Sequence, residues 1–221
     1  MEMQIREVEY EYRGRHQTVR AVRGATAAFE TGKMYAIMGA SGSGKTTLLS
    51  MLSGLIRPTA GEILLDGENM AAMDGGKLRR EKISVIYQDF NLFPLLTVEE
   101  NAAYSLMVQG QPKEEAFSKA RKTLLTVGIQ PEQFTRLPNT LSGGEQQRVA
   151  IARSLAGGSE IILADEPTGN LDEENSGNII DMLSRLAHEE ARCVIIVTHD
   201  PEVGKACDVV LHMRSGVLTE E

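Results

Sequence analysis

Four features are missing from this 221-residue sequence, and each absence excludes a class of protein or site. No apolar run approaches the roughly 18 residues of a membrane-spanning helix. The charged N-terminal stretch MEMQIREVEYEYRGRH also lacks the apolar centre of a signal peptide. The net charge of −8 gives no basic surplus for a nucleic-acid duplex. The two cysteines, Cys193 and Cys207, lack metal-ligand spacing. We therefore expect a soluble cytoplasmic protein without a nucleic-acid partner.

The order of apolar and polar segments predicts an α/β fold. Residues 1–33 alternate apolar and polar, which is typical of antiparallel strands with one solvated face. Residues 90–140 instead hold two helical stretches, near 97–109 and 112–127, without a strand pattern. Elsewhere, buried strands (34–39, 61–67, 82–89, 160–165, 193–199) alternate with helices (46–55, 143–156, 174–190) before a closing hairpin at 208–220. This alternation predicts a mostly parallel, helix-covered sheet with an N-terminal antiparallel β subdomain and an inserted α-helical subdomain.

A glycine-rich loop, GASGSGKT at 39–46, fits the pattern G-x-x-x-x-G-K-[ST] between a predicted strand and helix. Its glycines let backbone N–H groups turn toward phosphate oxygens, and the helix adds its positive N-terminal end. In this pattern Lys45 reaches the β- and γ-phosphates and the Thr46 hydroxyl binds Mg²⁺. Kinases, GTPases, helicases and transporter motors share the pattern. The residues expected at the nucleotide are Gly39, Ala40, Ser41, Gly42, Ser43, Gly44, Lys45, Thr46 and Thr47.

Four polar residues follow predicted buried strands. Asp165 and Glu166 come after IILA, Gln88 ends KISVIYQ, and His199 follows CVIIVT. Ligands of open α/β sheets collect at the carboxyl ends of the strands. We expect Asp165 to bind Mg²⁺ and Glu166 to be the general base that polarises the attacking water. Gln88 is a candidate for Mg²⁺ or the water, and His199 for the γ-phosphate.

A second glycine pair occurs in LSGGEQQR at 141–148. Ser142 and Glu145 have capping-box spacing, so a helix should begin here with free N–H groups that suit an anion. An ordinary capped helix has the same local pattern, so periodicity alone cannot distinguish an anion-binding helix start from a purely structural one.

The motifs in order resemble those of the ATP-binding cassette (ABC) ATPases. The phosphate loop, Gln88, LSGGEQQR, IILADE, GNLD (169–172) and THD (198–200) cover essentially the whole chain. The stretch ADEPTGNLD is similar to the branch with lipoprotein-releasing, macrolide-exporting, antimicrobial-peptide-resistance and cell-division cassettes. The resemblance implies one P-loop NTPase domain, with a RecA-like core of about 1–89 and 157–221 and a helical subdomain of about 90–156.

The resemblance also implies a head-to-tail dimer that sandwiches two ATP molecules. Ser142, Gly143 and Gly144 would contact the ATP of the other subunit, and Asp172 would communicate across the interface. An aromatic residue before the phosphate loop would stack on adenine, with Tyr12 preferred over Tyr10.

A separate integral membrane permease is the implied partner, which would place the chain at the inner face of the cell membrane. The apolar set in QDFNLFPLLTVEEN is the candidate docking surface, although about half of it should pack the subdomain instead: Phe90, Leu92, Phe93, Leu95 and Leu96. One alternative is a mechanotransmission or cell-division ATPase that moves no substrate. Another is a DNA-repair or translation ATPase, against which the acidic charge counts.

Overall fold

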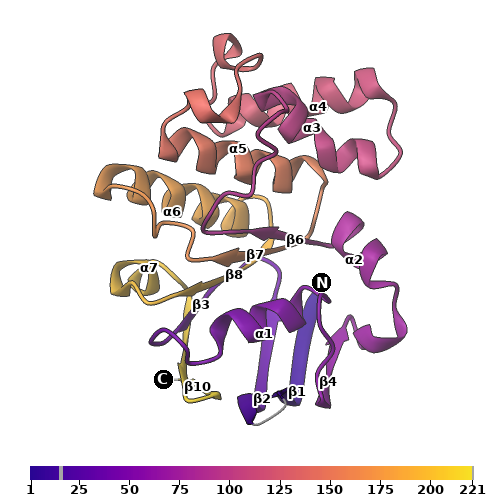
Figure 1. The fold of residues 1–221 in the computed structure, drawn as a ribbon, viewed down its shortest axis with the longest axis vertical. Coiled ribbons are helices and arrows are strands. Elements are labelled where there is room, and N and C mark those ends of the chain that lie inside the picture. Colours follow the sequence, from indigo (N-terminus) through magenta and orange to yellow (C-terminus); the bar gives the residue numbers. More distant parts are fainter. Residues whose placement is uncertain (15–16, 221) are drawn as a thin grey trace.

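The larger of two sheets in the computed structural model, which describes residues 1–14 and 17–220, is the mostly parallel sheet that the sequence predicts. Its strand order is β10-β9-β3-β8-β7-β6 (Figure 1). The strands are β3 (Met34–Met38), β6 (Ile83–Ile86), β7 (Ile161–Asp165), β8 (Cys193–Thr198), β9 (Val209–Arg214) and β10 (Val217–Glu220). All pairs are parallel except the β9–β10 hairpin. Strand β8 is buried along its whole length, because helices cover both faces of the sheet.

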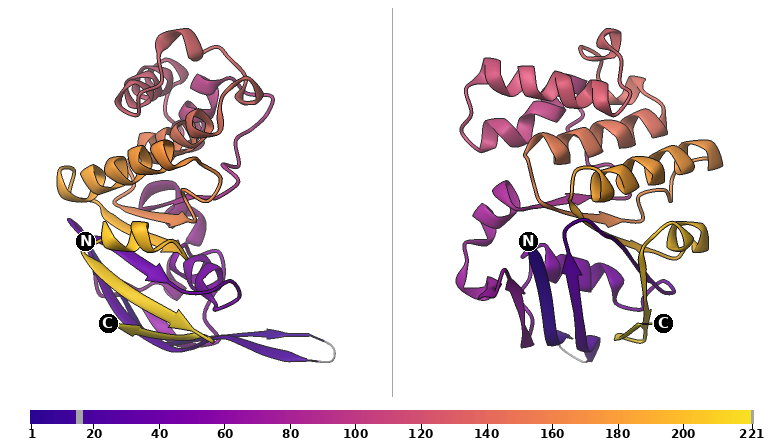
Figure 2. Two further views of the ribbon diagram at one scale, coloured as in Figure 1. Left: turned by 90° about the vertical axis from the view of Figure 1, so that its left-hand side faces the viewer. Right: turned by 180° about the vertical axis from the view of Figure 1, so that it is seen from behind.

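The second sheet is antiparallel, with the order β2-β1-β4-β5. It contains β1 (Glu2–Arg13), β2 (Thr18–Glu30), β4 (Ala60–Leu65) and β5 (Glu68–Asn69). The pairing of β1 with β2 is interrupted by register shifts around Val8 and Tyr10. The ends of β1 and β2 project from the rest of the molecule, and they carry Tyr12 (Figure 2).

Two helices lie on opposite faces of the parallel sheet. Helix α1 (Lys45–Leu52) fills the space between the two sheets, where its leucines pack with residues of β1, β3 and β4. Helix α6 (Glu173–His188) packs on the other face, in the same apolar cluster as the helical subdomain. Two short helices, α2 (Gly75–Glu81) and α7 (Pro201–Lys205), complete this part of the chain.

The inserted helical subdomain is present as predicted. Helices α3 (Val98–Val108), α4 (Lys113–Thr126) and α5 (Gly143–Ala156) pack together. The single turns η2 (Pro131–Gln133) and η3 (Pro138–Thr140) lie between α4 and α5, and a further turn, η1 (Met70–Ala72), precedes α2. Strand β6 ends three residues before the predicted position 89, because the chain turns where Phe90 N–H donates to the Tyr87 carbonyl at 3.1 Å. Gln88 therefore lies in a turn after the strand. None of the helices in the described ranges is both long and apolar enough to cross a membrane.

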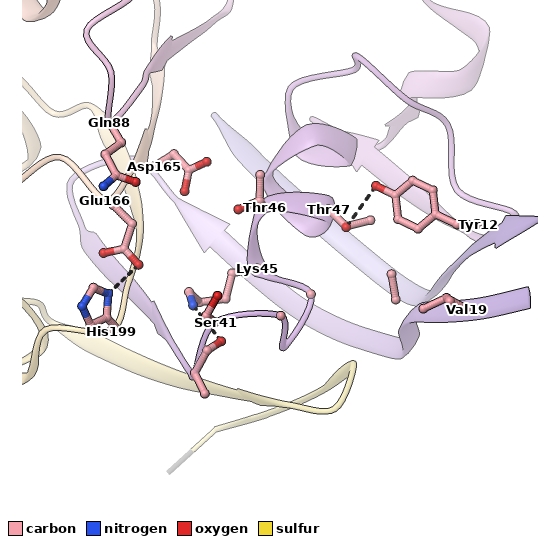
Figure 3. Close-up of a pocket in the computed structure, with 14 residues that line it drawn as sticks. Tyr12, Val19, Ser41, Lys45, Thr46, Thr47, Gln88, Asp165, Glu166 and His199 are labelled. Carbon is pink, nitrogen blue, oxygen red and sulfur yellow. Dashed lines mark hydrogen bonds and ion pairs between the residues drawn. The ribbon is translucent and has the colours of Figure 1, made fainter. Parts of the chain in front are cut away.

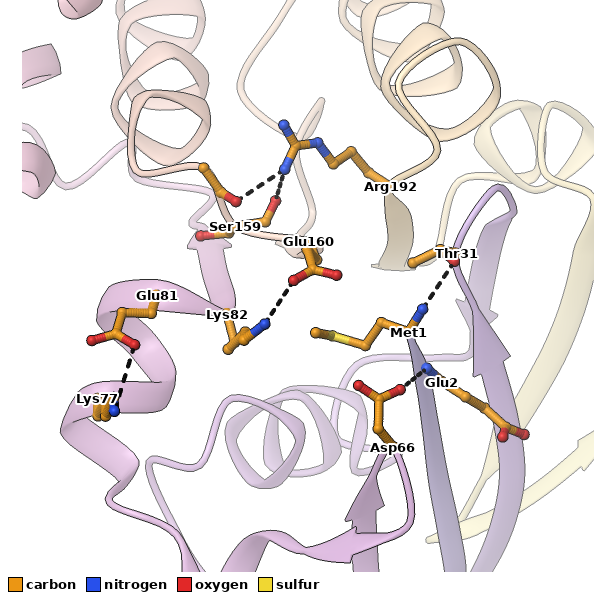
Figure 4. Close-up of polar contacts among 11 residues, drawn as sticks. Met1, Glu2, Thr31, Asp66, Lys77, Glu81, Lys82, Ser159, Glu160 and Arg192 are labelled. Atoms are coloured by element: carbon orange, nitrogen blue, oxygen red, sulfur yellow. Dashed lines mark hydrogen bonds and ion pairs between the residues drawn. The ribbon is translucent and has the colours of Figure 1, made fainter.

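Polar contacts also gather at the amino ends of the parallel strands (Figure 4). The Met1 ammonium donates to Thr31 Oγ1 at 3.3 Å, and Glu2 N–H donates to Asp66 Oδ1 at 2.8 Å. Nearby, Lys82 Nζ is 2.8 Å from Glu160 Oε1 and ties β6 to β7. The opposite edge, at the carboxyl ends of the strands, is left for the loops that carry the predicted site residues.

Candidate active site

Most of the predicted site residues gather around one elongated cavity of about 620 Å³ at the carboxyl ends of β3, β7 and β8. This volume is typical of a small-molecule site. Tyr12 and Val19 lie toward one end, and Gln88, Glu166 and His199 lie at the other (Figure 3). The lining residues are Tyr12, Val19, Ala21, Ala40, Ser41, Gly42, Gly44, Lys45, Thr46, Thr47, Gln88, Asp165, Glu166 and His199.

The phosphate loop connects β3 to α1 and forms the floor of this cavity. Lys45 Nζ donates to the carbonyl oxygens of Gly39 at 2.6 Å and Ala40 at 3.1 Å, so the ammonium lies against the loop. Gly44 has φ 110°, and a Cβ there would lie 2.2 Å from the Ala21 carbonyl oxygen. Only glycine fits this position. Two predicted loop residues, Gly39 and Ser43, lie outside the cavity lining.

Glu166 is the most constrained acidic residue of the site. Its φ of 45° lies in the left-handed region, which is uncommon for a residue with a side chain and is often found at functional sites. Thr198 Oγ1 donates to Glu166 Oε2 at 3.1 Å, and His199 Nδ1 lies 2.9 Å from Oε1 (Figure 3). Both carboxylate oxygens are therefore oriented from the end of β8. Thr198 was missed by sequence reasoning, although its hydroxyl stands directly before the predicted His199.

Asp165, at the end of β7, has a different environment. Its pKa is raised above the ordinary value, first because the carboxyl is buried and second because the Glu166 carboxylate is close. Thr46 and Lys45 oppose this shift. Thr46, Gln88 and Asp165 line the same cavity with the oxygen donors that Mg²⁺ prefers. Across residues 1–14 and 17–220 no group of three or more acidic, His or Cys side chains forms a metal cage. Such a donor set suits an ion that also binds phosphate oxygens.

The raised pKa predicts that Asp165→Asn stabilises the protein in the absence of nucleotide. The pKa of Asp165 is higher in the folded than in the unfolded protein, so the ionised carboxylate lowers the free energy of unfolding. This destabilisation is complete above the folded pKa, and it disappears below the unfolded pKa of about 3.9. At pH 8 we expect the thermal midpoint to rise by roughly 2–4 °C. The difference should shrink as the pH falls toward 4. Calorimetry checks this, with the exposed Asp89→Asn as the matched control. Equal midpoints for both variants would contradict the prediction.

Tyr12 is the aromatic residue at the far end of the cavity. The residue is 49% exposed, and its hydroxyl is 3.2 Å from Thr47 Oγ1 on α1. Tyr10 packs edge-on against Tyr12, with ring centroids 4.9 Å apart, but it does not line the cavity. Val19 and Ala21 of β2 do line it and were not predicted. Tyr12 pairs with Val19 because the register shifts earlier in β1 change which residues of β1 and β2 lie opposite each other.

The second glycine pair lies outside the cavity. Ser142 Oγ accepts from Glu145 N–H at 3.3 Å, and Glu145 Oε2 accepts from Ser142 N–H at 2.7 Å, which confirms the predicted capping box at the start of α5. A Cβ on Gly144 would lie 2.5 Å from Asn175 Oδ1 of α6, so this glycine also permits close packing. Asp172 caps α6 by accepting from Asn175 N–H at 2.8 Å, and it too lies outside the cavity.

The fold and the cavity define the class of protein: a P-loop nucleotide-binding ATPase with a helical subdomain that carries LSGGE. The family model described as "ABC transporter" matches residues 22–169. The lipoprotein-releasing system ATP-binding protein LolD of Chromohalobacter salexigens is 40% identical over 213 residues, 95% of this chain and 90% of that protein. The macrolide export ATP-binding/permease protein MacB of Rhodopseudomonas palustris is 39% identical over 217 residues, 97% of this chain and 33% of that protein.

Among solved structures, the chain resembles the dimeric, post-hydrolysis ATP-binding cassette MJ0796 bound to ADP and phosphate. The TM-score is 0.90 at 34% identity, over 99% of this chain and 98% of that one. The chain belongs to the ABC transporter family, as an ATP-binding ATPase subunit similar to the lipoprotein-release and macrolide-export branch. The resemblance stated from the motifs is confirmed, and these comparisons give no support to the mechanotransmission or cell-division alternative.

Proposed function

We propose that this chain hydrolyses MgATP in the cavity described above, as one half of a head-to-tail dimer that drives a separate membrane permease. The observation that carries the proposal is the Glu166 carboxylate, which lines the cavity beside the phosphate loop and is oriented by Thr198 and His199. Measurement of the ATP hydrolysis rate of the Glu166→Gln variant tests this proposed catalytic role.

The elongated cavity suits a nucleotide lying along it. Adenine would stack on the Tyr12 ring at one end, and the triphosphate would follow the loop of residues 39–47 toward Glu166. Lys45 and the backbone N–H groups at the start of α1 would hold the β- and γ-phosphates. Thr46 and Asp165, with Gln88, would hold Mg²⁺, which when bound neutralises charge on the phosphate oxygens.

Glu166 would accept a proton from the water that attacks the γ-phosphate. The hydroxyl of Thr198 fixes one carboxylate oxygen, which leaves the carboxylate in one orientation for this transfer. His199 engages Glu166 through Nδ1, and we propose that its ring also contacts the γ-phosphate from the same edge of the sheet. Gln88, in the turn after β6, would position the water or the metal.

The LSGGE segment would complete the site from the partner copy. Ser142 is exposed at the N-terminus of α5, away from the cavity of its own chain. Ser142, Gly143 and Gly144 would contact the γ-phosphate of the other subunit's ATP, and Asp172 would lie at the interface. The similarity to the dimeric MJ0796 cassette supports a dimer of this kind of chain.

The chain would divide into a RecA-like core of about 1–89 and 157–221 and a helical subdomain of about 90–156. The segment 88–97, at the junction of these two parts, would bind the permease. Leu92 packs on the subdomain core, whereas Leu95 is 88% exposed and Phe93 is 37% exposed. This exposure of apolar side chains suits a protein interface. The permease would hold the chain at the inner face of the cell membrane.

A photo-crosslinking residue at Leu95 tests the docking surface in intact cells. We expect it to capture an integral membrane protein, whereas the same residue at Val217, a 44%-exposed position on β10, should not. If Val217 captures the same protein as efficiently, or Leu95 yields only soluble adducts, this surface is not the docking site.

A further inference from the structure

The Arg153 side chain joins α5 to the turn that follows Gln88. Its two terminal nitrogens donate to backbone carbonyl oxygens of adjacent residues: one to Asn91 at 2.7 Å and the other to Phe90 at 3.0 Å. The guanidinium also lies 5.8 Å from the centre of the Phe93 ring. Three contacts of one side chain therefore converge on residues 90–93.

This arrangement holds a half-buried cation without an anion beside it. Burial lowers the pKa of Arg153 below its ordinary value. Arg153 takes part in none of the ion pairs found within residues 1–14 and 17–220. Burying a charge without a counter-charge opposes folding unless hydrogen bonds compensate. Stability alone is thus a poor reason for an arginine at this position.

The residues whose carbonyls accept these bonds have unusual backbone conformations. Phe90 has φ 59° and Asn91 has φ 48°, two consecutive non-glycine residues in the left-handed region. Such a backbone conformation is strained for a residue with a side chain, and it persists only where its surroundings enforce it. The paired donors of Arg153 supply such an enforcement, because a guanidinium holds two acceptors in fixed geometry.

The two elements that Arg153 connects have different tasks in the proposed function. Helix α5 begins at the LSGGE segment, and Arg153 lies ten residues after Gly143, about 15 Å along the helix. The turn continues from Gln88 at the cavity to the exposed Phe93 and Leu95. Arg153 thus makes direct contact between these two elements.

We propose that Arg153 is the positioning residue that couples closure of the LSGGE helix on ATP to the conformation of residues 88–97. The inference rests on the proposed function. Because equilibrium coupling is reciprocal, binding of a partner at residues 88–97 would shift the LSGGE helix by the same free energy.

The test uses the full chain with Glu166→Gln, which is designed to retain MgATP and stay dimeric. Amide hydrogen exchange of residues 89–96 is measured with and without MgATP, after light scattering has established the dimer. In this parent and in a control that adds Arg121→Gln, MgATP should change the exchange rate by at least about fivefold. Arg121 is an exposed arginine of the same subdomain that pairs with Glu99, and its replacement removes the same charge. Adding Arg153→Gln should abolish the ATP-dependent change while the dimer still forms.

An Arg153→Gln dimer with the same ATP-dependent change as the parent would overturn the inference, and so would a parent dimer with no change. If Arg153→Gln does not fold, Arg153→Lys serves, because an ammonium keeps the charge but lacks the fork for two carbonyls. Full coupling in the lysine variant would likewise overturn the inference. A parent that remains monomeric with MgATP would instead overturn the proposed dimer, and this inference with it, before exchange is measured.

Discussion

Replacing Glu166 by glutamine is expected to lower the ATP hydrolysis rate by roughly 100- to 10,000-fold, the usual contribution of a general base. Glutamine keeps the size of the side chain and can still bond to Thr198 and His199, but it cannot accept the proton of the attacking water. ATP binding should remain close to that of the wild type. Phosphate release at saturating MgATP measures the rate, and light scattering should show ATP-bound dimer accumulating.

The matched control is Glu202→Gln. Glu202 lies beyond His199 on α7, and its side chain is 77% exposed and paired with Lys205. It undergoes the same chemical change close to the site, and its hydrolysis rate should stay within about twofold of wild type, as surface changes away from a site usually do. Normal turnover in Glu166→Gln would show that the general-base assignment is wrong.

The phosphate loop and the buried strands were predictable because their physical requirements are local. A turn that approaches phosphate needs glycine, and strands covered on both faces need continuous apolar runs such as CVIIVT. The capping box at Ser142 and Glu145 is local as well, and the structure confirms it. For these elements, the residues that determine the conformation are also the ones that adopt it.

Other features of the site and fold could not be predicted, because they depend on contacts between segments that are distant in the sequence. Thr198 orients Glu166 only because β7 and β8 are neighbours, 32 residues apart in sequence. Val19 reaches the cavity through a β1–β2 register that three irregularities have shifted. The short helices α2 and α7 have seven and five residues, too few for a recognisable periodicity. Their aspartate caps, Asp74 and Asp200, were the available signal.

The proposed trans arrangement of the LSGGE segment predicts an asymmetric result in mixed dimers. Ser142→Arg puts a long cation where the partner's γ-phosphate would lie, and Lys45→Ala removes the phosphate-binding ammonium, so each homodimer should be inactive. In a mixed dimer of the two variants, one composite site carries neither change and the other carries both. Purified through two affinity tags, it should retain up to about half of the wild-type hydrolysis rate if the sites act independently.

The reciprocal control places both changes in one chain and pairs it with an unchanged partner. If the LSGGE segment acts in trans, every site of this dimer carries one change and hydrolysis is lost; if it acts in cis, one site is intact and hydrolysis remains. The two dimers contain the same substitutions in the same number, so any loss of the Ser142 helix cap, about 0.5–2 kcal/mol, affects both equally. Ser142 is exposed and lies outside the cavity of its own chain, so we expect activity in the first dimer and none in the second.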